Sequence, residues 1–153
     1  CNAGSTSLKF KLYDMPSEVV LAKGGVERVG STDDAIFKYT NMSSGYDTVR
    51  KGQCIPDYKA GIRMFLDLLT SSDNGVIADV NEISRVGFKT VLCKGYYGIH
   101  ELTDSVLDGM QQWFVLAPVH NRAYLQSIEA MKDVEYFEVE GDVLDYDDVM
   151  EKV

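Results

Sequence analysis

Hydrophobic and polar residues alternate near the start of the chain. Between residues 8 and 13, Leu and Phe alternate with Lys and Tyr, a period of two that predicts a half-buried strand. Residues 14–17 predict a turn, because Pro16 fixes its own φ and lacks a donor. Extended runs follow at 19–29 and 35–39. Three consecutive strands joined by tight turns favour an antiparallel meander.

The period becomes helical after Pro56. Apolar residues recur at the spacing of one helical face from Tyr58 to Leu69, and Asp57 is in place to act as the N-cap. A second apolar stripe runs from Leu102 to Phe114 and ends near Pro118. Further strands are predicted over residues 76–80, 86–92 and 134–139. We therefore predict an α/β fold with a mixed sheet flanked by helices.

Composition fits one globular domain of ordinary size. The chain has 153 residues, of which 45% are hydrophobic and 25% charged, close to the averages for soluble proteins. No apolar run approaches the ~18 residues of a spanning helix, and the first residues do not have the pattern of a secretory signal, unless a segment before them has been removed. We expect a cytoplasmic protein with no membrane partner. Its three cysteines are widely spaced, which favours reduced thiols.

The charge balance excludes one class of partner. The formal net charge is −9, whereas proteins that bind nucleic acids usually carry a basic patch, so we expect no nucleic-acid partner. A run of carboxylates without a basic residue lies between Asp142 and Glu151. We interpret it as a solvated face or tail. A divalent-metal site is the alternative, although the ligand order and glycine turn of a calcium loop are absent.

The segment from Asn2 to Lys9 has the chemistry of a phosphate-binding turn. Gly4 can take a positive φ and lets backbone approach a ligand, while successive N–H groups and the hydroxyls of Ser5, Thr6 and Ser7 supply donors. Lys9 shares the strand face of Ser7, and the side-chain carbonyl of Asn2 suits magnesium. The residues alone leave a polar hairpin turn as the alternative, and the P-loop pattern is absent.

The order of these residues resembles the N-terminal signature of acetate and propionate kinases, Asn-x-Gly-Ser-Ser/Thr-Ser-Leu-Lys-Phe/Tyr. The resemblance continues along the chain in the family's order, at residues 13–16, 21–24, 26–30, 75–77, 83–87 and 116–121. It implies a ribonuclease-H-like domain of the actin, sugar-kinase and heat-shock-ATPase superfamily. Residues 1–153 would form a single N-terminal-type domain, without the family's first strand and its C-terminal domain.

The resemblance also implies an activity. Enzymes of this family transfer the terminal phosphoryl group of ATP, with Mg²⁺ as cofactor, to a short-chain carboxylate and produce an acyl phosphate. The implied partners are ATP or ADP, the carboxylate, and a missing C-terminal domain or complementary chain. A homodimer is left open, and the resemblance does not say which carboxylate is used.

Site residues follow from the resemblance position by position. The implied catalytic residues are His120, near the transferred group, and Lys89, where the family has the arginine that grips the carboxylate. The other matched positions are Asn2 for magnesium, Ser5, Ser7 and Lys9 for the phosphates of ATP, and Val91 and Val119 for the pocket that holds the alkyl end of the substrate.

The chain departs from the family at this site. Lys89 keeps a positive charge but loses the planar bidentate fork of arginine. Phe88 and Leu92 replace two histidines, and Arg122 and Ala123 replace two prolines after Asn121. The family's catalytic aspartate has no clean counterpart, and Asp142, the nearest residue, is not assigned that role.

Two functions remain in view. The first is the N-terminal half of an acetate-kinase-like enzyme, inactive as an isolated domain. The alternative is a divergent, non-catalytic relative that acts as a phosphate-ligand or partner-binding module.

Overall fold

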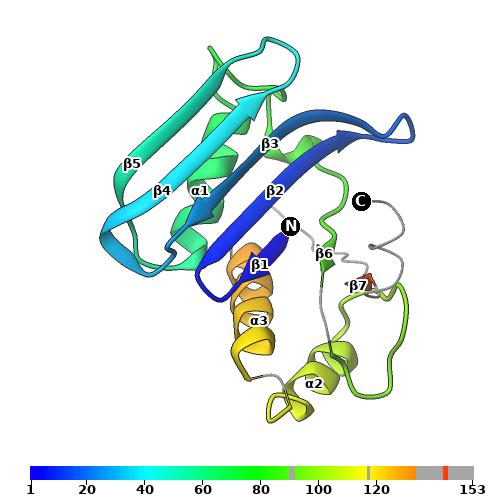
Figure 1. The fold of residues 1–153 in the computed structure, drawn as a ribbon. Coiled ribbons are helices and arrows are strands. Elements are labelled where there is room, and N and C mark those ends of the chain that lie inside the picture. The colour runs from blue at the N-terminus through cyan, green and yellow to red at the C-terminus, as the bar shows by residue number, and fades with distance from the viewer. Residues whose placement is uncertain (90–91, 117, 134–142, 145–153) are drawn as a thin grey trace. The chain divides into compact units, whose positions relative to one another are not determined.

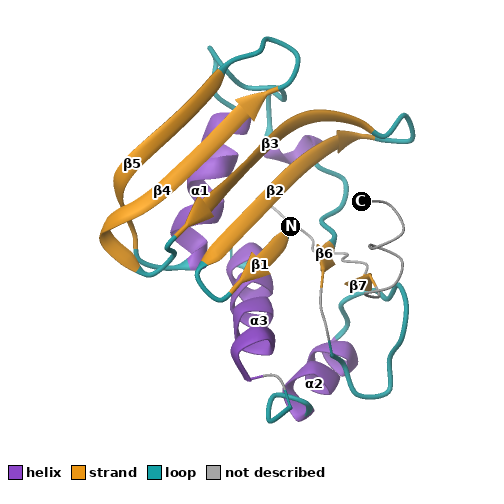
Figure 2. Ribbon diagram, viewed as in Figure 1, coloured by secondary structure: helices purple, strands orange, loops and turns teal. Residues whose placement is uncertain are grey.

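The computed structural model describes residues 1–89, 92–116, 118–133 and 143–144. These residues form two compact units. The first unit is continuous and runs from Thr6 to Ile83, whereas the second combines Cys1–Ser5 with the chain from Ser84 onward. Each unit contains both helices and strands (Figure 2).

The unit formed by residues 6–83 is built on an antiparallel meander. Its strands are β2 (Ser7–Asp14), β3 (Val19–Glu27), β4 (Ser31–Asn41) and β5 (Asp47–Ile55), and each pairs with the next in chain order (Figure 1). The three strands and the meander predicted from the sequence are confirmed, and β5 adds a strand that the sequence did not predict. The register places Gly25 of β3 opposite Lys9 of β2 and opposite Lys38 of β4.

Helix α1 (Tyr58–Leu69) covers one face of the meander (Figure 1). It begins where predicted, because the Asp57 side chain accepts a hydrogen bond of 2.8 Å from the backbone N–H of Ala60. Phe65 of α1 stacks on Phe10, with ring centroids 4.5 Å apart. The approach is close enough that a Cβ added to Gly24 would lie 2.8 Å from the Phe65 ring. Glycine at this position therefore allows the helix to reach the sheet.

The loop after α1 is tied back to β4. The hydroxyl of Tyr39 donates to the carbonyl of Asn74 at 3.0 Å. The Asn41 side-chain amide donates to the carbonyls of Asn74 and Gly75, both at 3.1 Å. Within the loop, the Gly75 N–H donates to the Ser71 carbonyl at 2.9 Å. These bonds fix an irregular segment against the buried side of the sheet.

The predicted strand over residues 76–80 is wrong. The backbone N–H groups of Val76 and Ile77 instead donate to the carbonyl of Leu69, at 2.9 and 3.2 Å, and thereby satisfy an end group of α1. A short 3₁₀ helix, η1, follows at Val80–Glu82, with the Asp79 side chain as its cap. The apolar residues here finish a helix rather than pair in a sheet.

The other unit contains β1 (Asn2–Gly4), β6 (Phe88–Lys89), β7 (Val143–Leu144), α2 (Asp104–Gln112) and α3 (Pro118–Lys132). Strands β6 and β7 pair in parallel, with Phe88 opposite Val143. Within the strand predicted over 86–92, Phe88–Lys89 forms β6, while residues 90 and 91 lie outside the described residues, as do 134–139. Antiparallel and parallel strands together with helices confirm the predicted α/β class.

Helix α3 was not predicted, and it begins at Pro118, where we expected a helical stripe to end. Proline suits the first helical position, because it lacks an N–H that would have no partner there. The helix packs against β1 and α2. Its buried residues include small and polar ones, which weakens the hydrophobic period: Asn121, Ala123, Tyr124, Ser127, Ile128, Ala130 and Met131.

Candidate functional site

The candidate phosphate turn lies between β1 and β2. Asn2 and Ser5 belong to one unit, and Ser7 and Lys9 to the other. Leu8, between Ser7 and Lys9, is fully buried on the α1 side, so Ser7 and Lys9 occupy the opposite, open face of β2. Gly25 lies opposite Lys9 on β3 and offers no side chain to it. Lys9 is therefore an exposed cation.

A neighbouring turn holds the end of this segment. The backbone N–H of Val29 donates to the carbonyl of Thr6 at 2.8 Å. Val29 is preceded by Arg28, whose φ of 61° lies in the left-handed region that side-chain-bearing residues seldom occupy. This φ lets the chain reverse sharply after β3. The conformation of Arg28 is thus coupled to the hydrogen bond that holds Thr6.

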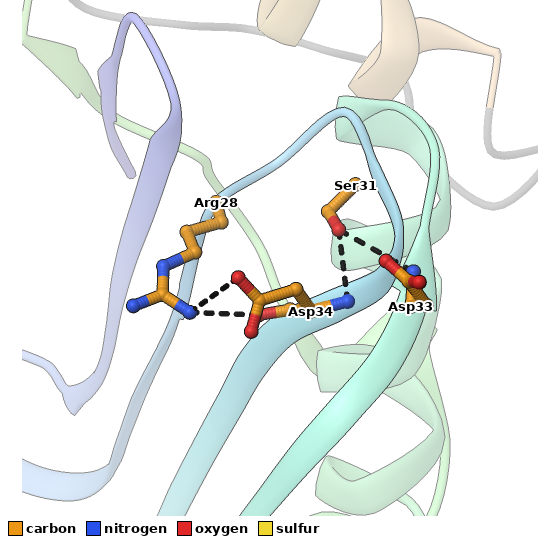
Figure 3. Close-up of polar contacts among 4 residues, drawn as sticks. All are labelled: Arg28, Ser31, Asp33 and Asp34. Carbon is orange, nitrogen blue, oxygen red and sulfur yellow. Dashed lines mark hydrogen bonds and ion pairs between the residues drawn. The ribbon is translucent and has the colours of Figure 1, made fainter.

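The same turn is closed by an ion pair (Figure 3). The Arg28 Nη1 atom lies 2.6 Å from Oδ2 of Asp34 and 3.3 Å from the Asp34 carbonyl. The Ser31 hydroxyl accepts backbone hydrogen bonds from Asp33 at 3.3 Å and Asp34 at 2.9 Å. The ion pair is exposed on both sides, so we expect at most about 1 kcal/mol from it.

Gly4 does not use its capacity for a positive φ. Among the described residues, the glycines with positive φ are Gly30, Gly45, Gly52, Gly95 and Gly98. Gly4 instead ends strand β1.

The residues implied for the carboxylate side lie in the other unit. Lys89 is in β6, where its backbone N–H donates to the carbonyl of Cys1 at 3.3 Å, and its neighbour Phe88 is buried. Val119 and His120 stand in the first turn of α3, and both are exposed. Val91 lies outside the described residues. Val119 and His120 thus lie in the same element, α3, whereas Lys89 lies in β6.

Exposed apolar residues precede Val119. Val115 and Leu116 are 86% and 67% exposed, and Val119 itself is 57% exposed. Side chains of this kind lose contact with water when a ligand or another part of a protein covers them.

Asn121 is the residue at this site that sequence reasoning missed. It is fully buried in the first turns of α3. Its Nδ2 group donates to the Met110 carbonyl at 3.0 Å and to the Leu92 carbonyl at 3.2 Å. Its Oδ1 atom is buried and has no partner among the described residues, which costs about 1–3 kcal/mol. The signal available in the sequence was a polar residue at helical spacing from Tyr124 and Ile128.

The chain between β6 and α2 is packed closely at the same place. The backbone N–H of Lys94 donates to the Gly109 carbonyl at 3.0 Å, and the Cys93 thiol donates to the Val106 carbonyl at 3.1 Å. A Cβ added to Gly109 would lie 2.8 Å from the Cys93 sulfur. Burial raises the pKa of the Cys93 thiol. Helix α2 and the chain after β6 are thus in direct contact.

The donors available to magnesium are few. In the part of the chain that the structure describes, no three His, Cys, Asp or Glu side chains form a metal-binding group. Asn2 contributes one exposed side-chain oxygen. Magnesium commonly keeps several waters and binds through substrate phosphates with one or two protein ligands. One amide oxygen suits a magnesium ion held mainly by water and phosphate. No helix among the described residues is long and apolar enough to cross a membrane.

Comparisons with known proteins identify the family and the fold. The model of the acetokinase family matches residues 1–148. The acetate kinase of Brachyspira hyodysenteriae is 38% identical over 136 residues, covering 87% of this chain and 33% of the relative. The acetate kinase of Bacillus subtilis is 38% identical over 139 residues, covering 87% and 32%. The crystal structure of Porphyromonas gingivalis acetate kinase matches with a TM-score of 0.84 and 30% identity, covering 94% of this chain and 35% of that one.

The structure is therefore an α/β chain with the fold of the acetate kinases, as the sequence predicted. The chain belongs to the acetokinase family. It spans about a third of the length of the curated relatives that it matches.

Proposed function

We propose that this chain is the N-terminal part of a phosphotransferase. The complete enzyme transfers the terminal phosphoryl group of ATP to a short-chain carboxylate and releases an acyl phosphate. The observation that carries the proposal is the match to the acetokinase family over residues 1–148, which includes both the phosphate turn and the first turn of α3. Residues 1–153 act as one N-terminal-type domain that requires the rest of the enzyme for turnover.

Ser5, Ser7 and Lys9 bind the phosphates in this proposal. Phosphoryl transfer depends on positioning and on stabilising the charge of the transferred group, and a lysine beside donor hydroxyls serves both needs. Two observations support this role: Lys9 is exposed on the open face of β2, and the Thr6 carbonyl is fixed by Val29. Asn2 would help to hold magnesium together with the phosphates of ATP, and the ion would neutralise phosphate charge.

Residues after Ser84 bind the carboxylate in this proposal. Lys89 supplies the positive charge that attracts the carboxylate, and His120 donates a hydrogen bond to the transferred phosphoryl group. Val91 and Val119 contact the alkyl end of the substrate. Lysine grips a carboxylate through one charged point rather than through a planar fork, so we expect a high KM for the carboxylate.

A second function has one observation in its favour. Phe88, which replaces a family histidine beside Lys89, is only 1% exposed and serves as core. A chain that retained the phosphate turn but converted its acceptor side to core would bind a phosphate ligand or a partner without catalysis. This non-catalytic module is the alternative to the kinase.

The test separates the two functions. The coding region that flanks this chain is sequenced, and the protein that it encodes is assayed for acyl phosphate, trapped as the hydroxamate. The kinase proposal expects activity in that protein and none in the isolated 153-residue chain. Absence of activity in the longer protein would favour the non-catalytic module.

Lys9→Ala is the diagnostic variant for the phosphate turn. In the longer protein we expect kcat to fall by about 10²–10³, the effect of removing one stabilising group from a transition state. Lys11→Ala is the matched control, because Lys11 is exposed on the same face of the same strand, two residues further on. Equal losses from both variants would contradict a special role for Lys9. Acyl phosphate formed by the isolated chain above a Lys9→Ala background would contradict the expectation that this chain needs the rest of the enzyme.

A further inference from the structure

The side chain of Asn121 joins three segments of one unit. Asn121 lies in the first turn of α3. Its Nδ2 group donates one hydrogen bond to the carbonyl of Met110, in the last turn of α2, and another to the carbonyl of Leu92, in the chain after β6. These are the segments next to the residues proposed for the carboxylate side. Lys89 lies three positions before Leu92, and His120 immediately precedes Asn121.

Burial alone does not account for an asparagine at this position. Its Oδ1 atom is fully buried and has no hydrogen-bond partner among the described residues. An apolar residue of similar size would fill the same space without leaving that oxygen unpaired. The side-chain amide instead donates hydrogen bonds to two carbonyls in two different segments, and a single rotamer makes both bonds.

The helix geometry connects this bond set to His120. Neighbouring residues in a helix point about 100° apart, so buried Asn121 and exposed His120 move together when α3 turns about its axis. A rotation of roughly 10° displaces the end of a side chain, about 5–6 Å from the axis, by about 1 Å. Two hydrogen bonds to fixed carbonyls resist such a rotation. Catalytic groups tolerate little displacement, since about 1 Å can cost roughly 100-fold in rate.

We propose that Asn121 is a positioning residue for the carboxylate side of the site. Its buried carboxamide fixes the rotation of the first turn of α3, and with it Val119 and His120, relative to the chain that carries Lys89. The proposal rests on the proposed kinase function only for its catalytic consequence. The structural part concerns the described residues of one unit and can be tested alone.

The first experiment follows the two histidine side chains by NMR in the 153-residue chain, with His100→Gln used to assign them. Asn121→Leu keeps the volume but removes both donors. We expect it to shift and broaden the His120 ring signal while the His100 signal is unchanged. Ile128→Val, a buried substitution in the same helix, is the control for general loss of stability. An unchanged His120 signal in Asn121→Leu, or an equal change in Ile128→Val, would overturn the proposal.

Two further measurements keep the proposal testable if Asn121→Leu does not fold. Asn121→Ala removes the same donors with a smaller side chain, and the same change in the His120 signal is expected. In the unmodified chain, the Asn121 side-chain amide protons should exchange with solvent at least about 10-fold more slowly than those of exposed Asn2. Equal exchange rates would contradict the two hydrogen bonds on which the argument depends.

The catalytic consequence is measured in the longer protein. Asn121→Leu should lower kcat by about 100-fold with little change in the KM for ATP, whereas Ile128→Val leaves kcat unchanged. If the unmodified longer protein forms no acyl phosphate, the kinase proposal fails while the NMR result still decides the role of Asn121. If kcat is unaffected in an active protein, Asn121 has no positioning role in catalysis.

Discussion

At the scale of single residues, Cys54 and Cys93 lie in opposite environments. Cys54 is exposed near the end of β5, whereas Cys93 is buried and donates to the Val106 carbonyl. Burial disfavours the thiolate and raises the pKa of Cys93. Because the thiolate is the reactive form, Cys93 is protected both by its burial and by its weaker ionisation.

We predict that iodoacetamide labels Cys54 first in the folded chain and Cys93 only after unfolding in urea. Mass spectrometry of the digested protein measures both sites, and labelling of Cys93 at the rate of Cys54 would contradict the burial.

The raised pKa of Cys93 also predicts how the stability of the fold depends on pH. As pH rises through the ordinary thiol pKa near 9.0, the unfolded chain loses this proton first, so the free energy of unfolding falls.

The candidate site residues could be predicted from the sequence only where local order determines them. Ser7 and Lys9 share a strand face because alternation alone places them there, and the structure agrees. Asn121 acts through carbonyls that are 11 and 29 positions away in the chain, and no local pattern reveals such partners. Polar residues that are buried by tertiary contacts are therefore the ones that sequence reasoning misses.

At the scale of elements, the sequence predicted those with strong hydrophobic periods. Strands β2 and β3 and helix α1 follow from alternation and from the Asp57 cap. Strand β5 was missed because most of its residues are exposed and Gly52, with φ of 64°, interrupts it. Helix α3 was missed because alanine, serine and asparagine occupy much of its buried face. In both cases packing partners, rather than the local pattern, define the element.

The contact of α1 with the sheet gives a prediction for stability. Gly24→Ala places a Cβ 2.7 Å from the Lys38 carbonyl and 2.8 Å from the Phe65 ring, and a backbone atom cannot move aside easily. We expect the free energy of unfolding to fall by about 1–3 kcal/mol. Gly87→Ala is the control, because a Cβ there meets nothing within 4 Å. Urea denaturation measures both variants, and equal midpoints would show that the sheet accommodates the methyl group.

At the scale of the whole molecule, the chain leaves one compact unit and enters the other at two places. One crossing lies between Ser5 and Thr6, and the other between Ile83 and Ser84. The unit of residues 6–83 is continuous in sequence, whereas the other needs the first five residues together with the second half of the chain. Closing that long loop costs more entropy. We therefore expect the continuous unit to form first during folding.

The second crossing predicts a site of proteolysis. Arg85 is exposed in a segment without helix or strand, whereas Arg63, also exposed, lies within the hydrogen-bonded turns of α1. Exposed segments of this kind are cut first, because a protease must bind the backbone in an extended form. We expect limited trypsin digestion to cleave after Arg85 before it cleaves after Arg63, as mass spectrometry of early time points would show. Earlier cleavage after Arg63 would mean that α1 opens more readily than this segment.

The hydrogen bond from Gly75 to Ser71 also affects how the protein ages chemically. An asparagine followed by glycine loses ammonia readily when the glycine nitrogen attacks the asparagine side-chain carbonyl and closes a succinimide ring, which water then opens to aspartate or isoaspartate. Here the Gly75 backbone nitrogen donates to the Ser71 carbonyl. The Tyr39 and Asn41 side chains donate to the backbone carbonyl of Asn74, which belongs to the same peptide group as this nitrogen. The nucleophile is thus kept from turning toward its target. Asn74 should deamidate more slowly in the folded chain than in the unfolded one. The rate of this reaction should therefore rise when the hydrogen bonds of the loop are lost.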